Sequence, residues 1–458
     1  MRRFATEFLF LFFAIALALP AQQSADRVRE LEKKVEELEH RLDALTAGAD
    51  EERRRQIEEL RRQIDVLTRE IENLKSAAPE KATPAGERGA FGLGPAASKV
   101  YGSTRGVSIG GYGEVLYQNF ATERENGSKS GRTDTIDLAR AVFYFGYKFD
   151  DHFLFNSEIE YEHATTGEGA EEKGEVSVEF AYLDYLARPE VNVRAGLLLL
   201  PLGFVNELHE PPVFLGARRP EVERRIIPAT WRELGIGVFG DAGPFAYRAY
   251  LVNGLDAGGL DAASPLREAR QGGAEARAED FAVTARLDFT GVPGLLVGAA
   301  GYSGGSAQGR EVAGRSFDAR VTVLDAHAEW RWRGIQARAL AVRGTIGDAA
   351  DVNRSNGFTN EDSVGRRFTG TYVEAGYDVL FGRASGSLVP FLRWERFDTQ
   401  DEVPAGFASD PANDVRLWTV GLQYRPIPQV VVKLDYQDAH DQARTGVNQW
   451  NLALGWLF

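Results

Sequence analysis

The chain has 458 residues, a formal net charge of -14 and no Cys. The missing Cys excludes a disulfide framework, a thiolate metal site and a Cys nucleophile. The acidic balance, without a basic stripe, argues against a nucleic-acid partner. No two His residues stand at i and i+4, so no metal and no cofactor is expected.

Residues 1–21 have the pattern of a secretory signal peptide. Arg2 and Arg3 form a charged start, an apolar run extends from Phe8 to Leu19, and Ala21 is a suitable last residue before cleavage. An uncleaved membrane anchor is the alternative, although the apolar run is short for a span. No later run is long and apolar enough for a transmembrane helix, so a membrane-inserted mature protein would have to be a barrel.

Residues 22–75 predict a coiled coil in two short segments. Apolar residues recur at alternating steps of three and four, for example Leu31, Val35 and Leu38, and charged residues fill the other positions. The pattern leaves open a two- or a three-stranded coil, and also a pair of amphipathic helices packed on a domain. Residues 76–105, rich in Ala, Pro and Gly, predict a flexible linker.

From residue 106 to 458 apolar and polar residues alternate with the period of a β-strand. Apolar residues facing outward and charged residues facing inward are typical of a membrane barrel with a wet lumen. A soluble sandwich also alternates, with its apolar face turned inward. We predict sixteen strands, near 106–118, 134–149, 152–163, 174–187, 190–200, 233–241, 245–253, 280–290, 295–304, 316–330, 335–346, 367–381, 386–398, 414–425, 429–440 and 446–458.

The lengths of the connections between these strands distinguish a membrane barrel from a soluble sandwich. Odd-numbered connections are mostly long and even-numbered ones are short, as at Asp150-Asp151 and Arg188-Pro189. Long loops on one rim and tight turns on the other are the topology of outer-membrane barrels. We therefore predict an all-β fold, a 16-stranded antiparallel transmembrane β-barrel over 106–458, preceded by a short periplasmic α-helical coiled coil. A barrel of this size leaves an aqueous channel.

The last strand supports this prediction. Trp450, Leu452, Leu454, Trp456 and Phe458 fall on one strand face. A soluble protein rarely exposes such a face, whereas lipid covers it in a membrane barrel and aromatic residues prefer the interface.

The longest connection, 201–232, is too apolar for a loop in solvent, and we expect it to fold into the barrel and narrow the pore. Opposed charges in such a constriction would set ion selectivity. A surface cap or a subunit contact is the alternative. The expected cationic side is Arg218, Arg219, Arg224 and Arg225, and the expected anionic side is Glu207, Glu210, Glu221 and Glu223.

Charged residues at inward strand positions are candidates for the pore wall. Most are expected to be solvated residues, and a minority to contact solute. Arg is suited to bidentate recognition of carboxylate or phosphate, which favours anionic solutes. The wall candidates are Arg140, Lys148, Glu158, Glu160, Arg194, Arg248, Arg286, Arg338, Arg393 and Lys433, together with Glu114, Glu162, Glu179 and Glu395.

The stretches Gly110-Gly-Tyr-Gly-Glu114, Arg194-Ala-Gly196 leading into Pro201-Leu-Gly203, and Glu233-Leu-Gly-Ile236 resemble the phosphate-selective porin O and P family. The resemblance spans roughly residues 106–458, and the N-terminal coil resembles that of related dicarboxylate porins. It implies a homotrimer of sixteen-stranded barrels with an inward third loop. The barrel region carries few Lys residues, so phosphate specificity is not carried over.

These patterns favour a porin of the cell outer membrane, with its coil in the periplasm, for passive diffusion of small anionic solutes such as phosphate or carboxylates. An enzymatic activity is not expected. The expected partners are outer-membrane lipid, the solutes, two further copies of the chain and, through the coil, the cell wall. Two alternatives remain: a barrel that serves mainly as a structural tether to the cell wall, and a lipase-type outer-membrane enzyme using a Ser and one of His152, His163 or His327.

Overall fold

The computed structural model describes residues 33–34, 62, 89–165, 173–383 and 386–458. The chain divides into two units, Met1–Pro84 and Ala85–Phe458. In the first unit Lys33, Lys34 and Arg62 are helical. The predicted signal peptide and the rest of the predicted coiled coil lie outside the described residues. Among the described helices, none has the length and apolar character needed to cross a membrane.

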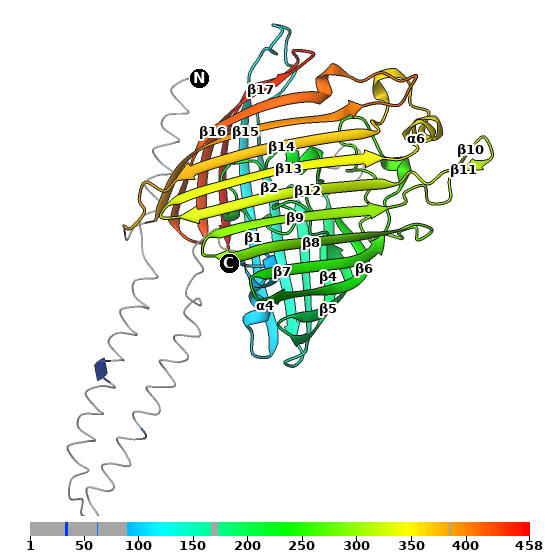
Figure 1. Ribbon diagram of the computed structural model, residues 1–458. Helices are drawn as coiled ribbons and strands as arrows, with labels where there is room; N and C mark the ends of the chain where they lie inside the picture. The colour runs from blue at the N-terminus through cyan, green and yellow to red at the C-terminus, as the bar shows by residue number, and fades with distance from the viewer. Residues whose placement is uncertain (1–32, 35–61, 63–88, 166–172, 384–385) are drawn as a thin grey trace, which may run out of the picture. The chain divides into compact units, whose positions relative to one another are not determined.

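Sixteen strands of the second unit form a closed barrel in which neighbours pair antiparallel (Figure 1). They overlap the sixteen predicted ranges, so the predicted barrel is confirmed. A small hairpin of β10 and β11, which the sequence patterns did not predict, lies in one loop. The strands are β1 Gly106–Phe120, β2 Thr135–Lys148, β3 Phe153–Glu162, β4 Val176–Arg188, β5 Val191–Leu199, β6 Arg232–Ala242, β7 Phe245–Asn253, β8 Phe281–Val292, β9 Leu295–Gly304, β10 Glu311–Val312, β11 Arg315–Ser316, β12 Val321–Trp332, β13 Ile335–Ile346, β14 Arg367–Tyr377, β15 Ser387–Glu402, β16 Asp414–Ile427, β17 Val430–Asp441 and β18 Gln449–Leu457.

The helices of this unit are short and lie in its connections. Two of them precede β1, and the others lie in loops between strands. They are η1 Ala90–Gly92, α4 Lys99–Gly102, η3 Pro211–Val213, α5 Val222–Arg225, η4 Ala257–Gly259, α6 Ala349–Asn356, η5 Asn360–Asp362 and η6 Pro411–Asn413.

The barrel is apolar outside and polar inside. In β16, Trp418, Val420 and Leu422 are 45%, 54% and 39% exposed, whereas Thr419 and Gln423 are 0% and 1% exposed. Successive side chains of a strand point to opposite faces, so one strand supplies both surfaces. A continuous apolar outer surface is the reverse of a soluble domain and is suited to lipid.

The two rims of the barrel differ in their connections. Tight turns such as 189–190, 243–244 and 333–334 form one rim, which we call the short-turn rim. The opposite long-loop rim carries α6 and the β10–β11 hairpin, whereas α4 lies at the short-turn end (Figure 1). β18 pairs with β1 and leaves the barrel without an unpaired edge. The outward positions of Trp450 and Phe458, which are 51% and 46% exposed, agree with the predicted lipid-facing terminal strand.

Residues 89–102, within the segment expected to be a flexible linker, are packed against the barrel. Leu93, Ala96, Ala97 and Val100 are between 1% and 3% exposed. The first three belong to the same buried apolar cluster as Tyr112, Tyr144 and Tyr182 of the wall. Residues 89–102 therefore do not form the flexible linker expected over 76–105, because their apolar side chains are buried against the barrel.

Candidate functional site

The third long loop, residues 200–231, runs through the inside of the barrel. It leaves β5 and returns at β6, yet the amide of Ala217 donates a 2.6 Å hydrogen bond to Asp435 of β17. The amide of Val222 donates a 3.1 Å bond to Glu395 of β15. β5 and β15 are eight strands apart in either direction around the barrel, which places them on opposite walls.

The sequence of this loop explains why it folds inward. Phe204, Leu208, Val222 and Ile226 are between 0% and 1% exposed, so the apolar residues that would be unstable in a solvated loop are buried. The amide of Trp231 donates to the Asn206 side chain, which in turn donates to the carbonyls of Leu200 and Trp231. Asn206 thereby joins the two ends of the loop.

Glu223 links two distant parts of the same loop. Its carboxylate accepts 2.6 Å hydrogen bonds from the amides of Phe204 and Val205 and another of 2.6 Å from the Tyr372 hydroxyl of β14. Burial raises the pKa of Glu223, and these donors oppose the shift. A buried carboxylate with three donors is a structural group, because leaving it unpaired would cost stability.

Three arginines of the loop surround one carboxylate, and we call Arg218, Glu221, Arg224 and Arg225 the arginine cluster. Glu221 lies 3.0 Å from Arg218 and 2.5 Å from Arg224, and Arg225 is 3.6 Å away. The Arg218, Arg224 and Arg225 side chains are 21%, 33% and 42% exposed. Three positive charges face one negative charge, so the cluster is cationic and partly open to solvent.

The protonation of Glu221 follows from this geometry. Burial alone would raise its pKa, but Arg224, Arg218 and Arg225 together outweigh burial and hold the pKa of Glu221 well below its usual range. Burial lowers the pKa of Arg218 to about 10, which leaves it protonated at neutral pH. The net charge of the cluster is therefore positive over the physiological pH range.

The remaining residues expected in the constriction lie elsewhere. Arg219 is 7% exposed and donates to the His209 carbonyl at 3.3 Å, so it is a buried residue of the loop. Glu207 is paired with Arg248 at 3.1 Å, and Glu210 accepts bonds from the amides of Ala96 and Ala97. These carboxylates, like Glu223, are 1% to 4% exposed. The expected anionic side of the constriction is thus not supported, because three of its members are used to hold the loop.

Most wall candidates point inward and are paired. Arg393 is fully buried between Glu374 at 3.1 Å and Glu395 at 2.9 Å, and its guanidinium also donates to the Arg218 carbonyl at 3.3 Å. Arg140 is paired with Glu114 and Glu160. Apart from the half-buried Arg140, Lys148 and Glu162, the predicted wall residues are buried: Glu114, Glu158, Glu160, Glu179, Arg194, Arg248, Arg286, Arg338, Arg393, Glu395 and Lys433.

The paired wall has a physical cause. Charged side chains beneath the loop have lost contact with water, and burial of a charge is tolerated only when partners replace the water. Arg286 is paired with Asp288 at 2.8 Å, and Lys433 donates to the Gly216 carbonyl of the loop at 2.9 Å. The expectation of a mostly solvated wall therefore does not hold for the part that the loop covers.

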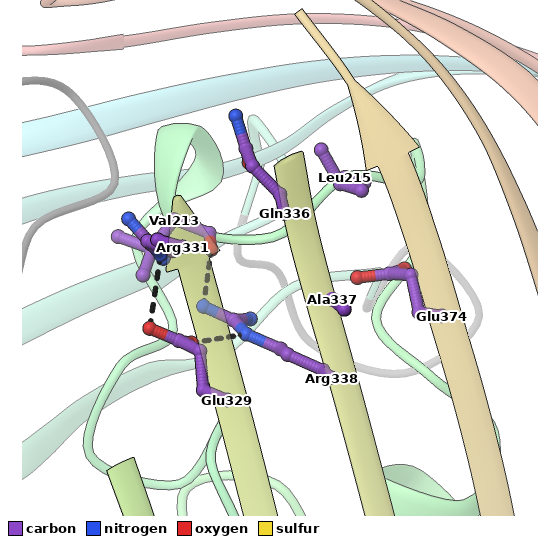
Figure 2. Close-up of a pocket in the computed structure, with 8 residues that line it drawn as sticks. All are labelled: Val213, Leu215, Glu329, Arg331, Gln336, Ala337, Arg338 and Glu374. Carbon is purple, nitrogen blue, oxygen red and sulfur yellow. Dashed lines mark hydrogen bonds and ion pairs between the residues drawn. The ribbon is translucent and has the colours of Figure 1, made fainter. Parts of the chain in front are cut away.

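A small pocket lies between the loop and the β12–β14 wall (Figure 2). Val213 and Leu215 of the loop form one side, and Glu329 and Arg338 form part of the other. Glu329 is held between Arg338 and Arg331, and Arg338 also donates to the Val213 carbonyl at 2.9 Å. Arg331, Gln336, Ala337 and Glu374 complete the lining.

The packed segment 89–102 was missed by sequence reasoning. It touches the site directly, since the amides of Ala96 and Ala97 donate to Glu210 of the third long loop, both at 2.9 Å. The available signal was the presence of Phe91, Leu93 and Tyr101 in a stretch otherwise rich in small residues. Solvated linkers rarely carry such side chains.

No family model matches the chain. A protein of Aquifex aeolicus described as uncharacterized is 39% identical over 379 residues, covering 80% of this chain and 83% of that protein. The Salmonella typhi OmpF complex with daunomycin has a TM-score of 0.50 at 13% identity and covers 78% of this chain and 98% of that one. The outer membrane channel DcaP of Acinetobacter baumannii has a TM-score of 0.49 at 13% identity, covering 77% of this chain and 97% of that one. At these identities the likeness to OmpF concerns the fold alone.

Proposed function

We propose that this chain, which belongs to the same family as the uncharacterized Aquifex aeolicus protein, is an outer-membrane porin through which small anionic solutes diffuse passively. The observation that carries the proposal is the inverted surface of a closed sixteen-stranded barrel, apolar outside and charged inside. Such a barrel is stable in lipid and encloses more space than its wall side chains fill.

The arginine cluster supports anions as the permeating class. It lies on a loop that crosses the lumen, it carries a net positive charge, and its side chains reach solvent. Fixed positive charge in a narrow passage lowers the free energy of an anion there and raises that of a cation. Phosphate and small carboxylates fit this chemistry because Arg can bind both in a bidentate manner.

The orientation and assembly belong to the same proposal. The short-turn rim would face the periplasm and the long-loop rim the outside, as is usual for outer-membrane barrels. Residues 22–75 would form a coil in the periplasm that contacts the cell wall. The apolar outer face would contact lipid and two further copies in a homotrimer. Catalysis has no role in this function.

The test is single-channel recording of the purified full chain in planar bilayers, with ion substitution. We expect discrete conductance steps and, in a salt gradient, a reversal potential that shows anions to be more permeant than cations. A folded, inserted protein that stays without conductance even after the contacts of residues 89–102 with the barrel are removed by mutation would contradict the proposal. That result would instead favour the barrel as a structural tether. The packed segment 89–102 fits such a role because it joins the N-terminal part of the chain to the short-turn end of the barrel.

A further inference from the structure

The N-terminal segment, residues 89–102, occupies the short-turn end of the lumen and is bonded to the inner wall. The Asn156 side chain of β3 donates to the Ala97 carbonyl at 2.9 Å. Arg248 of β7 donates to the Phe91 carbonyl at 2.5 Å. The Phe91 ring packs edge-on against Phe239 of β6 with 4.9 Å between ring centroids. The segment thus covers an arc of wall that reaches from β3 to β7.

Tyr101 at the end of this segment completes a buried ionic group. Its hydroxyl donates to Asp184 at 2.6 Å and accepts from Arg194 at 2.7 Å. Arg194 also lies over the ring of Tyr182, 4.0 Å from the centroid. Without Tyr101, the Asp184–Arg194 pair would have one face open toward the lumen.

The fit between the segment and the wall is close. A Cβ at Gly92 would lie 1.7 Å from a guanidinium nitrogen of Arg248, and one at Gly94 would lie 2.4 Å from a carboxylate oxygen of Glu210. Gly92 also has a φ of +79°, which larger residues rarely adopt. Glycine at these two positions lets the backbone lie close to the two charged side chains.

The third long loop contacts β16 and β18 at the same end. Its Pro212 carbonyl accepts from Arg425 near the end of β16 at 3.5 Å, and Pro211 lies against Gly455 of β18, where an added Cβ would be 2.5 Å from the Pro211 ring. The loop and the segment meet at Glu210, which accepts from Ala96 and Ala97. Together they contact β16, β18 and the wall from β3 to β7 from within.

We propose that residues 89–102 are a movable plug that closes the periplasmic end of the channel, and that the channel conducts fully when this segment leaves the lumen. The inference rests on the proposed porin function. The channel would then contain two inner elements, the fixed third long loop and the movable segment 89–102.

The way the segment is held makes it separable from the barrel. Among the described residues, its backbone-to-backbone hydrogen bonds are all local, such as Ser98 to Gly94 and Tyr101 to Ser98, and none joins the sheet. Its bonds to the wall are made through side chains, which water can replace once the segment leaves. Gly106, with a φ of +93° and no atom within 4 Å of an added Cβ, is the first residue of β1 and can serve as the hinge.

A reversible disulfide can test the plug, because the chain has no Cys of its own. A Cβ built at Gly146 of β2 lies 2.6 Å from the Val100 Cβ. A shift of about 1 Å would bring the pair to the roughly 3.8 Å of a disulfide. The double variant Val100→Cys/Gly146→Cys is purified as the full chain and recorded in planar bilayers, first oxidised and then after reduction. The single variants V100C and G146C are the controls.

A release variant tests the opposite direction. Phe91→Ala/Tyr101→Ala removes the edge-on ring contact and the hydroxyl between Asp184 and Arg194. The matched control is Tyr377→Ala/Phe381→Ala, two aromatic residues at the same rim that face outward and are 50% and 56% exposed. We expect the release variant to raise mean single-channel conductance by at least about twofold, and the outward control to match the unmodified protein.

The outcomes separate the plug from the porin function. Low conductance in the oxidised double-Cys protein that rises on reduction, together with the gain in the release variant, supports the plug. Equal conductance in the unmodified, oxidised and release proteins overturns the plug and leaves the porin function intact. Absence of conductance in every folded variant overturns both. A silent unmodified protein with a conducting release variant supports the plug and identifies the resting channel as closed.

Discussion

Asp184 and Arg194 face each other on β4 and β5, and two hydrogen bonds of 2.8 and 2.9 Å join the carboxylate to the guanidinium. The hydroxyl of Tyr101, which precedes the barrel in the chain, bonds to both side chains. In a channel without an inserted segment, an ion pair on the inner wall would have water in the position that the Tyr101 hydroxyl occupies here. The inside of this barrel is thus organised around segments that enter it.

Neutralising the arginine cluster is expected to reduce anion selectivity. In the triple variant Arg218→Ala/Arg224→Ala/Arg225→Ala, Glu221 remains and the local charge changes sign. The reversal potential in a salt gradient should shift toward that of a cation-selective pore. A comparable loss of charge at Arg315, Arg320 and Arg354 of the outer loops is the control and should have little effect, since exposed charges are screened. An unchanged reversal potential in the triple variant would show that ions do not pass the cluster.

Removing the carboxylate of the cluster should act in the opposite direction. Glu221→Gln leaves three arginines without their counter-charge, so anion selectivity should increase. Glu311→Gln in the exposed β10–β11 hairpin is the matched control. If E221Q and the arginine triple variant shift the reversal potential in the same direction, the electrostatic explanation is wrong and a steric one is needed.

Arg393 is expected to stabilise the barrel. Its fully buried guanidinium lies between Glu374 and Glu395, so Arg393→Met removes the cationic partner of two buried carboxylates. Loss of one partner of a buried ion pair typically costs about 3–5 kcal/mol. Arg396→Met, whose side chain is 49% exposed beside Asp414, should cost less than about 1 kcal/mol. Urea titration of the folded fraction on unheated gels measures both, and equal midpoints would contradict the prediction.

The outward apolar face should be sensitive to charge at the middle of a strand. Val420 of β16 is 54% exposed, and Val420→Lys would place a charge against acyl chains. Such a change at the bilayer midplane costs about 2–4 kcal/mol. Refolding yield into lipid vesicles should fall, while Ala313→Lys in the loop hairpin should leave it unchanged. Normal insertion of V420K would argue that this face contacts protein or water.

Acid is expected to favour the inserted N-terminal segment through Glu210, which belongs to the loop and not to a membrane-spanning strand. Burial raises the pKa of Glu210 to about 7, and the amides of Ala97 and Ala96 oppose the shift. Lys99, Tyr144, Glu158 and His209 are the titratable groups that face it. When the segment leaves, Glu210 regains water and its ordinary pKa of 4.5.

The sign of the effect follows from the two pKa values. The inserted state binds the proton more tightly, so this contribution to insertion is complete below the ordinary pKa and is lost as the pH rises through about 7. Open probability should therefore increase between roughly pH 5 and pH 8. Glu210→Gln should remove that increase, while Glu221→Gln should retain it. An unchanged pH profile in E210Q would mean that another group titrates.

The barrel could be predicted from the sequence because its signal is repeated in every strand. The period-two alternation and the unequal connections each recur along the chain, so an error in one strand leaves the count intact. The inward third loop was also predictable, since Phe204, Leu208 and Ile226 could not remain in water. Local composition was sufficient for these features.

The roles of single charged residues were not predictable in the same way. Glu221 and Glu223 are two positions apart, yet the first lies in the arginine cluster and the second is a buried acceptor for Phe204 and Val205. Which role each takes depends on partners that are distant in sequence, such as Tyr372. The segment 89–102 was missed for a similar reason, because small residues are typical both of linkers and of closely packed backbone.

The third long loop also has a mechanical consequence. It is continuous with β5 at one wall and hydrogen-bonded to β15 and β17 at the opposite wall. Lateral pressure that flattens a hollow cylinder must change its diameter. In this barrel the third long loop spans the diameter and is attached to the wall at both ends. The barrel should therefore resist becoming elliptical along this direction, and bilayers of different stiffness should alter its shape less than that of an unbraced tube of equal circumference.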